Sequence, residues 1–236
     1  TIDTIRMKIA FPSRYTLLIG FIFLFIVLSF VLRVVFLIWN FSEIDHGPVS
    51  LLSTFFTGLF YDLGTVTFFA SVASIYFLAI PKRFIGSLAD RIICYTGFSV
   101  GMFIIYFSFF AEITFWDEFQ RRFNFIAVDY LIYTYEVVKN INESYPLPVL
   151  IGSMVLLVIS TVFLFKKSGV FNRTFESADS FKMRLFPSVL ILGVATIFAF
   201  FIKNEDAELS ENRYNNELSK AGIYSFFAAF RNNELS

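Results

Sequence analysis

The chain has 236 residues, of which 57% are hydrophobic and only 16% are charged. A soluble globular domain has roughly 45–50% apolar and about 25% charged residues, so this composition predicts a membrane protein with several spanning segments. The formal net charge is zero, which excludes the strongly basic surface that is typical of nucleic-acid-binding proteins.

Five apolar runs are long enough to cross a bilayer. The hydrocarbon core is about 30 Å thick and a helix rises about 1.5 Å per residue, so about 20 apolar residues span it. The predicted transmembrane helices cover residues 15–39, 51–80, 92–115, 147–165 and 185–202. We therefore expect an all-α, polytopic membrane domain over residues 1–202, followed by a polar segment over residues 203–236.

Loop charges predict how these helices cross the membrane. Arg6, Lys8 and Arg14 precede the first run, and basic residues also fill the loops after the second and fourth runs. The loop over residues 40–50 contains no Lys or Arg. Because Lys and Arg are enriched in cytoplasmic loops, we expect the N-terminus inside and the C-terminus outside.

Residues 116–146 form the longest segment that is neither a continuous apolar run nor a short loop. From Phe123 onward, apolar and small side chains recur at helical spacing, and charged side chains such as Asp129 occupy the opposite face. This pattern predicts an amphipathic helix on the outer surface, which either lies on the membrane or covers a partner domain.

Charged residues inside the apolar runs are the sharpest candidates for a functional site. Asp62 lies well within the second run, where a carboxylate costs roughly 2.5–3.5 kcal/mol on insertion scales. Arg33 in the first run is its expected partner, and Glu112 near the end of the third run competes for that arginine. Three interpretations stay open: an ion pair that fixes helix packing, an outward-facing polar cavity for a lipid head group or acceptor, and snorkelling of Arg33.

Arg121 and Arg122 follow Asp117 and Glu118 after the third run. They form either a solvated charge cluster or a pair of guanidinium groups that clamps the phosphate of an anionic lipid. Trp116, at the outer end of the third run, is expected to be an interfacial anchor.

Two segments resemble a known protein family. Residues 122–146, RFNFIAVDYLIYTYEVVKNINESYP, follow the third run, and residues 212–235, NRYNNELSKAGIYSFFAAFRNNEL, follow the fifth. Both resemble the membrane portion of the lipoteichoic acid synthase-like family, which comprises sulfatase-like proteins of the alkaline phosphatase superfamily. The resemblance extends over essentially the whole chain, because members of the family also have five spans, an inside N-terminus and an outer C-terminus.

The resemblance implies an extracytoplasmic α/β catalytic domain after residue 236, with a threonine nucleophile and a divalent metal, manganese or zinc. Such an enzyme transfers phosphoglycerol or phosphoethanolamine from a phospholipid to an extracytoplasmic acceptor, although the sulfatase-like label leaves hydrolysis open as well. We expect none of the catalytic residues in this chain, so that it is inactive alone and anchors the catalytic domain in the bacterial cytoplasmic membrane. Its expected partners are membrane phospholipids and its own catalytic domain, with residues 203–236 as the linker.

On this interpretation, the outer amphipathic segment and residues 221–230 form a platform on which the catalytic domain docks. Its expected contact residues are Tyr130, Val137, Tyr224 and Phe227. The alternative function is a self-sufficient membrane scaffold or a small transport component. Transporters carry polar residues and broken helices in several spans, whereas only Arg33 and Asp62 are charged well within the runs here.

Overall fold

A computed structural model describes residues 12–132 and 146–233 of the chain. Within these residues every regular element is a helix, and none of them forms a strand. The elements, with η for 3-10 helices, are η1 (Ser13–Tyr15), α1 (Thr16–Trp39), η2 (Phe41–Glu43), α2 (Pro48–Ala79), η3 (Lys82–Phe84), α3 (Leu88–Phe119), α4 (Phe125–Ile132), α6 (Leu147–Lys167), α7 (Val170–Phe175), α8 (Phe181–Phe200), η4 (Glu205–Ala207), α9 (Arg213–Ser219) and α10 (Gly222–Asn233).

Five of these helices are long and apolar enough to span a membrane, which confirms the predicted number: α1 together with η1, α2, α3, α6 and α8. Helices α3 and α8 begin before the predicted residues 92 and 185, and a serine caps the first turn of each. The Ser87 hydroxyl accepts a hydrogen bond from the Asp90 amide at the start of α3, and Ser180 accepts from the Met183 amide at the start of α8. The side of the membrane on which each end lies stays a prediction from the loop charges.

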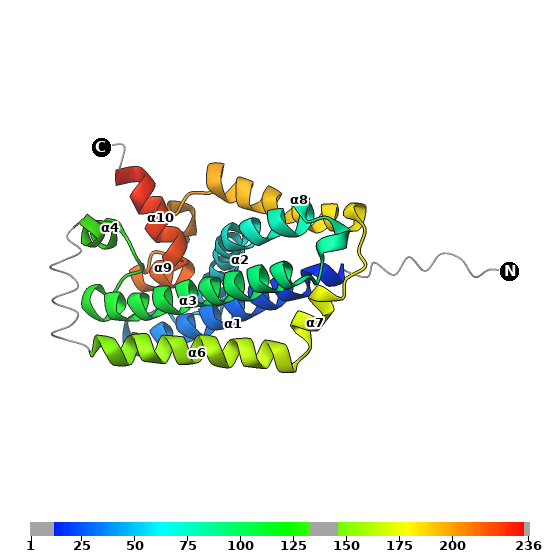
Figure 1. Cartoon of the computed structure of the whole chain (residues 1–236). Helices are drawn as coiled ribbons and strands as arrows, with labels where there is room; N and C mark the ends of the chain where they lie inside the picture. The colour runs from blue at the N-terminus through cyan, green and yellow to red at the C-terminus, as the bar shows by residue number, and fades with distance from the viewer. Residues whose placement is uncertain (1–11, 133–145, 234–236) are drawn as a thin grey trace.

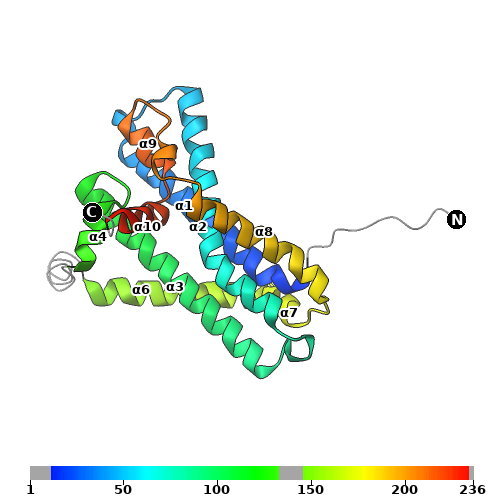
Figure 2. The same ribbon diagram turned by 90° about the horizontal axis from the view of Figure 1, so that it is seen from above.

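The described N- and C-terminal residues lie at opposite ends of the bundle (Figure 1). We call the end that carries α4, α9 and α10 the C-terminal end, and the end that carries η1, η3 and α7 the N-terminal end. Helix α1 packs against α2, α3 and α7, while α8 packs along α2 and α6 along α3. Helices α2 and α3 diverge from the short loop that joins them, as the view from above shows (Figure 2).

The apolar core lies where α1 meets its neighbours. Its buried side chains include Phe21, Phe25, Val66, Met102 and Ile105. The outward faces of the helices also carry large apolar side chains, such as Phe23, which is 68% exposed. Apolar surface of this extent is unusual for a soluble monomer, so these faces suit a hydrocarbon environment.

A buried arginine closes the N-terminal end of the bundle. Arg14 is 0% exposed, and its Nη1 and Nη2 donate to the two carboxylate oxygens of Asp90 at 2.9 and 2.5 Å. The Arg14 amide donates to Asp179 Oδ2 at 2.8 Å. Arg184 is buried as well and donates to the Phe77 carbonyl near the end of α2 at 2.7 Å. Arg14 and Arg184, which contribute to the loop-charge pattern, therefore also hold helices together.

The segment over residues 116–146 is not one continuous helix. Helix α3 continues past Trp116, and Gln120 then ends it in the left-handed conformation, with a φ of 51°. Helix α4 (Phe125–Ile132) follows after a turn. The predicted single amphipathic helix is therefore wrong over its first part, because Gln120 changes the chain direction before the apolar stripe begins. Residues 133–145, which complete the predicted helix, lie outside the described residues.

Gly64 of α2 marks a close approach between α2 and α8, since a Cβ atom there would overlap the ring of Phe198. We expect Gly64→Leu to lower the free energy of unfolding by about 1–3 kcal/mol through overpacking. Thermal unfolding of the purified protein in detergent measures this loss. The matched control is Gly193→Leu in α8, where a Cβ atom would meet no neighbour within 4 Å. Equal melting temperatures for the two variants would contradict this packing.

Candidate functional site

The segment that forms α9 and α10 lies at the C-terminal end of the bundle (Figure 1). Helix α9 packs against α1 and α2, and α10 packs against α2 and α4. Asn215, Leu218, Ser219 and Ala221 of this segment are buried. We call the contact of α9 and α10 with the ends of α1, α2, α3 and α8 the seat, because it holds the segment within the membrane domain.

Arg33 of α1 and Asp62 of α2 form an ion pair inside the bundle, as predicted. Arg33 Nη1 lies 2.8 Å from Asp62 Oδ2, and each side chain is 1% exposed. Ser29 donates to the other carboxylate oxygen at 2.7 Å. Arg33 Nε donates to the carbonyl oxygen of Leu218 at 2.7 Å. The pair therefore joins two spans to the backbone of α9, and Gly58 leaves room for the guanidinium, which a Cβ atom there would overlap.

Glu112 of α3 forms an ion pair with Arg122 rather than with Arg33, so the expected competition for Arg33 is wrong. The left-handed turn at Gln120 brings the chain back to α3 and makes this pairing possible. The Arg122 amide donates to Glu217 Oε2 at 2.8 Å, and Arg122 Nε donates to the Glu217 carbonyl at 3.2 Å. This second pair joins α3 to α9.

Aromatic rings support Arg122 from the bundle side. Its guanidinium carbon lies 5.0 Å from the centroid of the Phe36 ring, a cation–π geometry. The Phe36 ring also stacks on Trp116 at a centroid distance of 4.2 Å. Trp116 is 0% exposed and donates from Nε1 to Asn40 Oδ1 at 2.8 Å. Its predicted role as an interfacial anchor is therefore wrong, because the protein encloses the ring.

Asn215 ties α9 to the loop between α1 and α2. Its Oδ1 accepts from the Asp45 amide at 2.9 Å, and its Nδ2 donates to the Asp45 carbonyl at 3.2 Å. Nδ2 also lies 3.1 Å from the hydroxyl of Ser50. The Gly47 amide, followed by the Ser50 hydroxyl, stabilises the Asp45 carboxylate and lowers its pKa. The loop therefore closes over α9 through both backbone and side-chain hydrogen bonds.

Lys220 follows α9 and is held by two carboxylates. Burial alone lowers the pKa of its ammonium, but Glu217 at 2.9 Å and Glu208 at 2.7 Å outweigh this effect, so the pKa is raised above its ordinary value. Lys220, Glu217, Glu205 and Arg122 line a polar pocket of about 330 Å³. Arg122 Nη2 is buried beside this pocket without a hydrogen-bond partner among the described residues. These charges suit a small anionic or zwitterionic group.

The start of α10 completes the seat. A Cβ atom on Gly222 would overlap the Glu112 carboxylate, so the chain passes close to α3 at this glycine. Tyr224 is buried, and its hydroxyl is shared between the carbonyl oxygens of Phe198 at 3.0 Å and Ile202 at 2.6 Å. Burial raises the pKa of this hydroxyl. Helix α10 is thereby fixed to the end of α8.

The structure brings Arg33, Asp62, Glu112 and Arg122 together around α9 and leaves Arg121 exposed on the surface. The two neighbouring arginines therefore do not form a shared phosphate clamp, because Arg122 turns inward to Glu112. A lipid-binding role for these residues stays a prediction.

The two segments expected to form a docking platform do pack together. Helix α4 contacts α10, and the ring of Phe123, just before α4, meets Phe226 edge-on at a centroid distance of 6.0 Å. Tyr130 is 40% exposed and Phe227 is 59% exposed. Both side chains are accessible, and the docking of a further domain on them stays a prediction.

The structure also bears on the other expected docking residues and on the expected linker. Tyr224 is not a surface contact, because its ring and hydroxyl are used to fix α10 to α8. Val137 lies outside the described residues. Part of the expected linker over residues 203–236 is packed in the seat as α9 and α10 rather than loosely attached.

Asn215, Glu217 and Lys220 are the residues of the seat that the sequence did not single out. They lie in a short polar stretch in which apolar residues do not recur at helical spacing, so the sequence there looks like that of a solvated loop. A usable signal was the unmet need for partners, since a buried Glu112 and a buried Arg33 each require more hydrogen bonds than one counter-ion supplies.

The divalent metal that the family resemblance implies would belong to the catalytic domain. Within residues 12–132 and 146–233, no group of three or more His, Cys, Asp and Glu side chains is arranged to hold a metal ion. Comparison with known proteins finds no matching family model, no similar curated protein and no similar solved structure.

Because Arg33 and Asp62 form a buried ion pair, removing one charge should destabilise the protein more than removing both. Asp62→Leu leaves the Arg33 charge buried without its counter-ion, and we expect it to lower the free energy of unfolding by about 3–5 kcal/mol. The double variant Arg33→Met/Asp62→Leu removes both charges, so its loss should be smaller, about 1–3 kcal/mol for the Leu218 carbonyl left without its donor. Thermal unfolding in detergent compares them, and a double variant less stable than Asp62→Leu would contradict the pairing.

Proposed function

We propose that this chain is the membrane domain of a lipoteichoic acid synthase-like enzyme in the bacterial cytoplasmic membrane. The C-terminal end of the bundle faces the extracytoplasmic side, and the catalytic domain follows residue 236. The enzyme transfers a phosphoglycerol or phosphoethanolamine head group from a phospholipid to an extracytoplasmic acceptor. The supporting observation is the seat, where the two segments that carry the family resemblance meet through Arg122 and Glu217.

The seat suits the anchoring of such an enzyme. A catalytic domain on a flexible tether samples a large volume above the membrane. Here α9 is held to α1, α2 and α3 through the Arg33–Asp62 and Arg122–Glu112 pairs. A domain attached after α10 therefore starts from a fixed point on the membrane domain. This confinement raises the effective concentration of phospholipid head groups at its active site.

The polar pocket beside the seat offers a contact for the head group. Lys220 offers a cation for a phosphate, and the exposed Glu205 offers a carboxylate for an ammonium group. The metal of the catalytic domain would supply Lewis-acid activation of the phosphoryl group. The residues of this chain bind and orient the lipid at that surface.

The buried charges favour this function over transport. Arg33, Asp62 and Glu112 are each ion-paired within the protein, and they hold the segment α9–α10 in place. Charged residues that line a transport path have to contact the substrate or a water-filled cavity, whereas these are 1% exposed.

Head-group transfer by the full-length protein tests the proposal. The protein is reconstituted into vesicles that contain phosphatidylglycerol or phosphatidylethanolamine together with a lipid-linked glycan as the acceptor, and the release of diacylglycerol is measured. We expect release from one of these phospholipids, and none from the same vesicles when only residues 1–236 are present. Folded full-length protein that releases diacylglycerol from neither phospholipid would overturn the proposal.

A surface variant tests the docking platform. We expect Tyr130→Asp in the full-length protein to lower head-group transfer roughly tenfold, as for the loss of a central contact residue, with an unchanged melting temperature. The matched control is Phe84→Asp, because Phe84 is 47% exposed but lies in η3 at the opposite end of the bundle. Equal transfer rates for the two variants would show that the catalytic domain does not dock on α4.

A further inference from the structure

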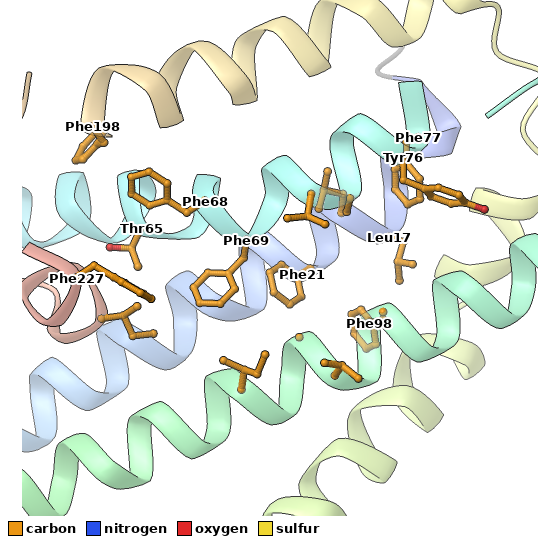
Figure 3. Close-up of a pocket in the computed structure, with 18 of the residues that line it drawn as sticks. Leu17, Phe21, Thr65, Phe68, Phe69, Tyr76, Phe77, Phe98, Phe198 and Phe227 are labelled. Carbon is orange, nitrogen blue, oxygen red and sulfur yellow. The ribbon is translucent and has the colours of Figure 1, made fainter. Parts of the chain in front are cut away.

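A long apolar groove runs along α1 between α2 and α3 (Figure 3). Its volume is about 740 Å³, which lies within the range of roughly 300–1,000 Å³ for small-molecule sites. Phe69 of α2, Phe21 of α1 and Phe98 of α3 line its middle, Phe227 of α10 lies at one end, and Tyr76 lies at the other. The lining residues lie between Thr65 and Phe77 on α2 and between Ile93 and Ile104 on α3, which is less than half of either helix.

The groove exists because α2 and α3 diverge from their common loop and leave one side of α1 uncovered (Figure 2). Small residues keep its walls open. Gly97 of α3 faces open space, since a Cβ atom there would meet no other atom within 4 Å. At Gly101, a Cβ atom would lie 3.2 Å from the ring of Phe21 on the floor. Helix α10 closes the groove at the C-terminal end through Ile223 and Phe227.

The polar side chains on the walls already have partners. The Thr65 hydroxyl donates to the Tyr61 carbonyl at 2.7 Å, and the Tyr76 hydroxyl donates to Asp90 at 2.8 Å. Tyr224 is engaged by carbonyl oxygens at the end of α8. The groove thus presents carbon surface to its contents and suits an alkyl chain rather than a polar ligand.

The rims of the groove identify the source of this alkyl chain. Val72 on α2 and Ile93 and Val100 on α3 are 75%, 49% and 52% exposed, and both helices are membrane-spanning candidates. The groove therefore opens sideways into the hydrocarbon region, where the available ligands are the acyl chains of bilayer lipids.

Arg231 of α10 lines the same groove at its C-terminal end. Its side chain is exposed, and its Nη1 donates to the Ala199 carbonyl at the end of α8 at 2.7 Å. This bond uses one of the five N–H donors of the guanidinium. A cation at the end of an apolar channel matches the chemistry of a phospholipid, whose phosphate lies at the end of its acyl chains.

We propose that the groove between α2 and α3 is a specific phospholipid site, with one acyl chain lying along α1 and the lipid phosphate at Arg231. Arg231, Gly97 and the apolar walls bind this lipid within the membrane domain itself. The site does not depend on the proposed catalytic domain, and its test requires no enzymatic activity.

Photolabelling of the full-length protein in phosphatidylcholine vesicles tests the site. The probe is phosphatidylglycerol with a diazirine in the middle of one acyl chain, and mass spectrometry quantifies the labelled residues. We expect labelling of Val72, Ile93 and Val100 to saturate at a low mole fraction of probe. Labelling of Leu156 and Ile159 on the outward face of α6, which are 64% and 60% exposed, should rise linearly. A linear rise at both places would overturn the proposal.

A pair of glycine variants locates the acyl chain. We expect Gly97→Leu to lower groove labelling roughly tenfold at low probe fraction, because its side chain displaces about two methylene groups of the lipid. The control is Gly152→Leu on α6, where a Cβ atom also meets no neighbour within 4 Å. Both variants should keep the wild-type melting temperature, and equal groove labelling in the two would contradict an acyl chain at Gly97.

Arg231→Gln tests the phosphate contact. We expect it to raise roughly tenfold the probe fraction at which groove labelling saturates. A diacylglycerol probe with the same diazirine chain lacks the phosphate, so wild type and Arg231→Gln should bind it equally. If Arg231→Gln leaves phospholipid labelling unchanged, the assignment of the phosphate to Arg231 is wrong.

Discussion

Each charge buried in this bundle needs a partner, and the rest of the structure depends on how those needs are met. Arg14, Arg33 and Arg122 are at most 1% exposed, and each is paired with a carboxylate on a different helix or segment. Removing one member of such a pair costs about 3–5 kcal/mol. Apolar contacts specify helix neighbours less sharply in a bilayer, because core-facing and lipid-facing side chains are both apolar. The ion pairs therefore determine which helix ends adjoin.

The buried ion pairs hold different parts of the chain at the two ends of the bundle. At the N-terminal end, the pair of Arg14 and Asp90 joins η1, just before α1, to the start of α3. At the C-terminal end, Arg33 and Arg122 have donors left after pairing, and these reach backbone carbonyls of α9. A segment after the last span thereby becomes an internal part of the membrane domain. An anchor for a further domain needs this property, since the attachment point must not move independently of the spans.

Helix α10 contributes residues both to the seat and to the apolar groove between α2 and α3. Gly222 at its start lies against the Glu112 carboxylate, whereas Ile223, Phe227 and Arg231 line the groove. A lipid bound in the groove and a domain attached after α10 would therefore contact the same helix. In the proposed enzyme, α10 would connect lipid occupancy of the groove to the position of the catalytic domain.

Hydropathy along the chain was sufficient to predict five spans, and the cost of a carboxylate in a bilayer was sufficient to pair Asp62 with Arg33. Both are properties of short stretches or of single residues within them. The partner of Glu112, the burial of Trp116 and the insertion of α9 depended instead on the left-handed turn at Gln120 and on which helix ends meet. The sequence around polar residues such as Glu217 has no hydrophobic periodicity, so a buried contact there cannot be told from a solvated loop. The sequence by itself therefore determined the membrane-spanning class and one ion pair, whereas only the tertiary structure decided the seat and the groove, because both are formed by residues far apart in the chain.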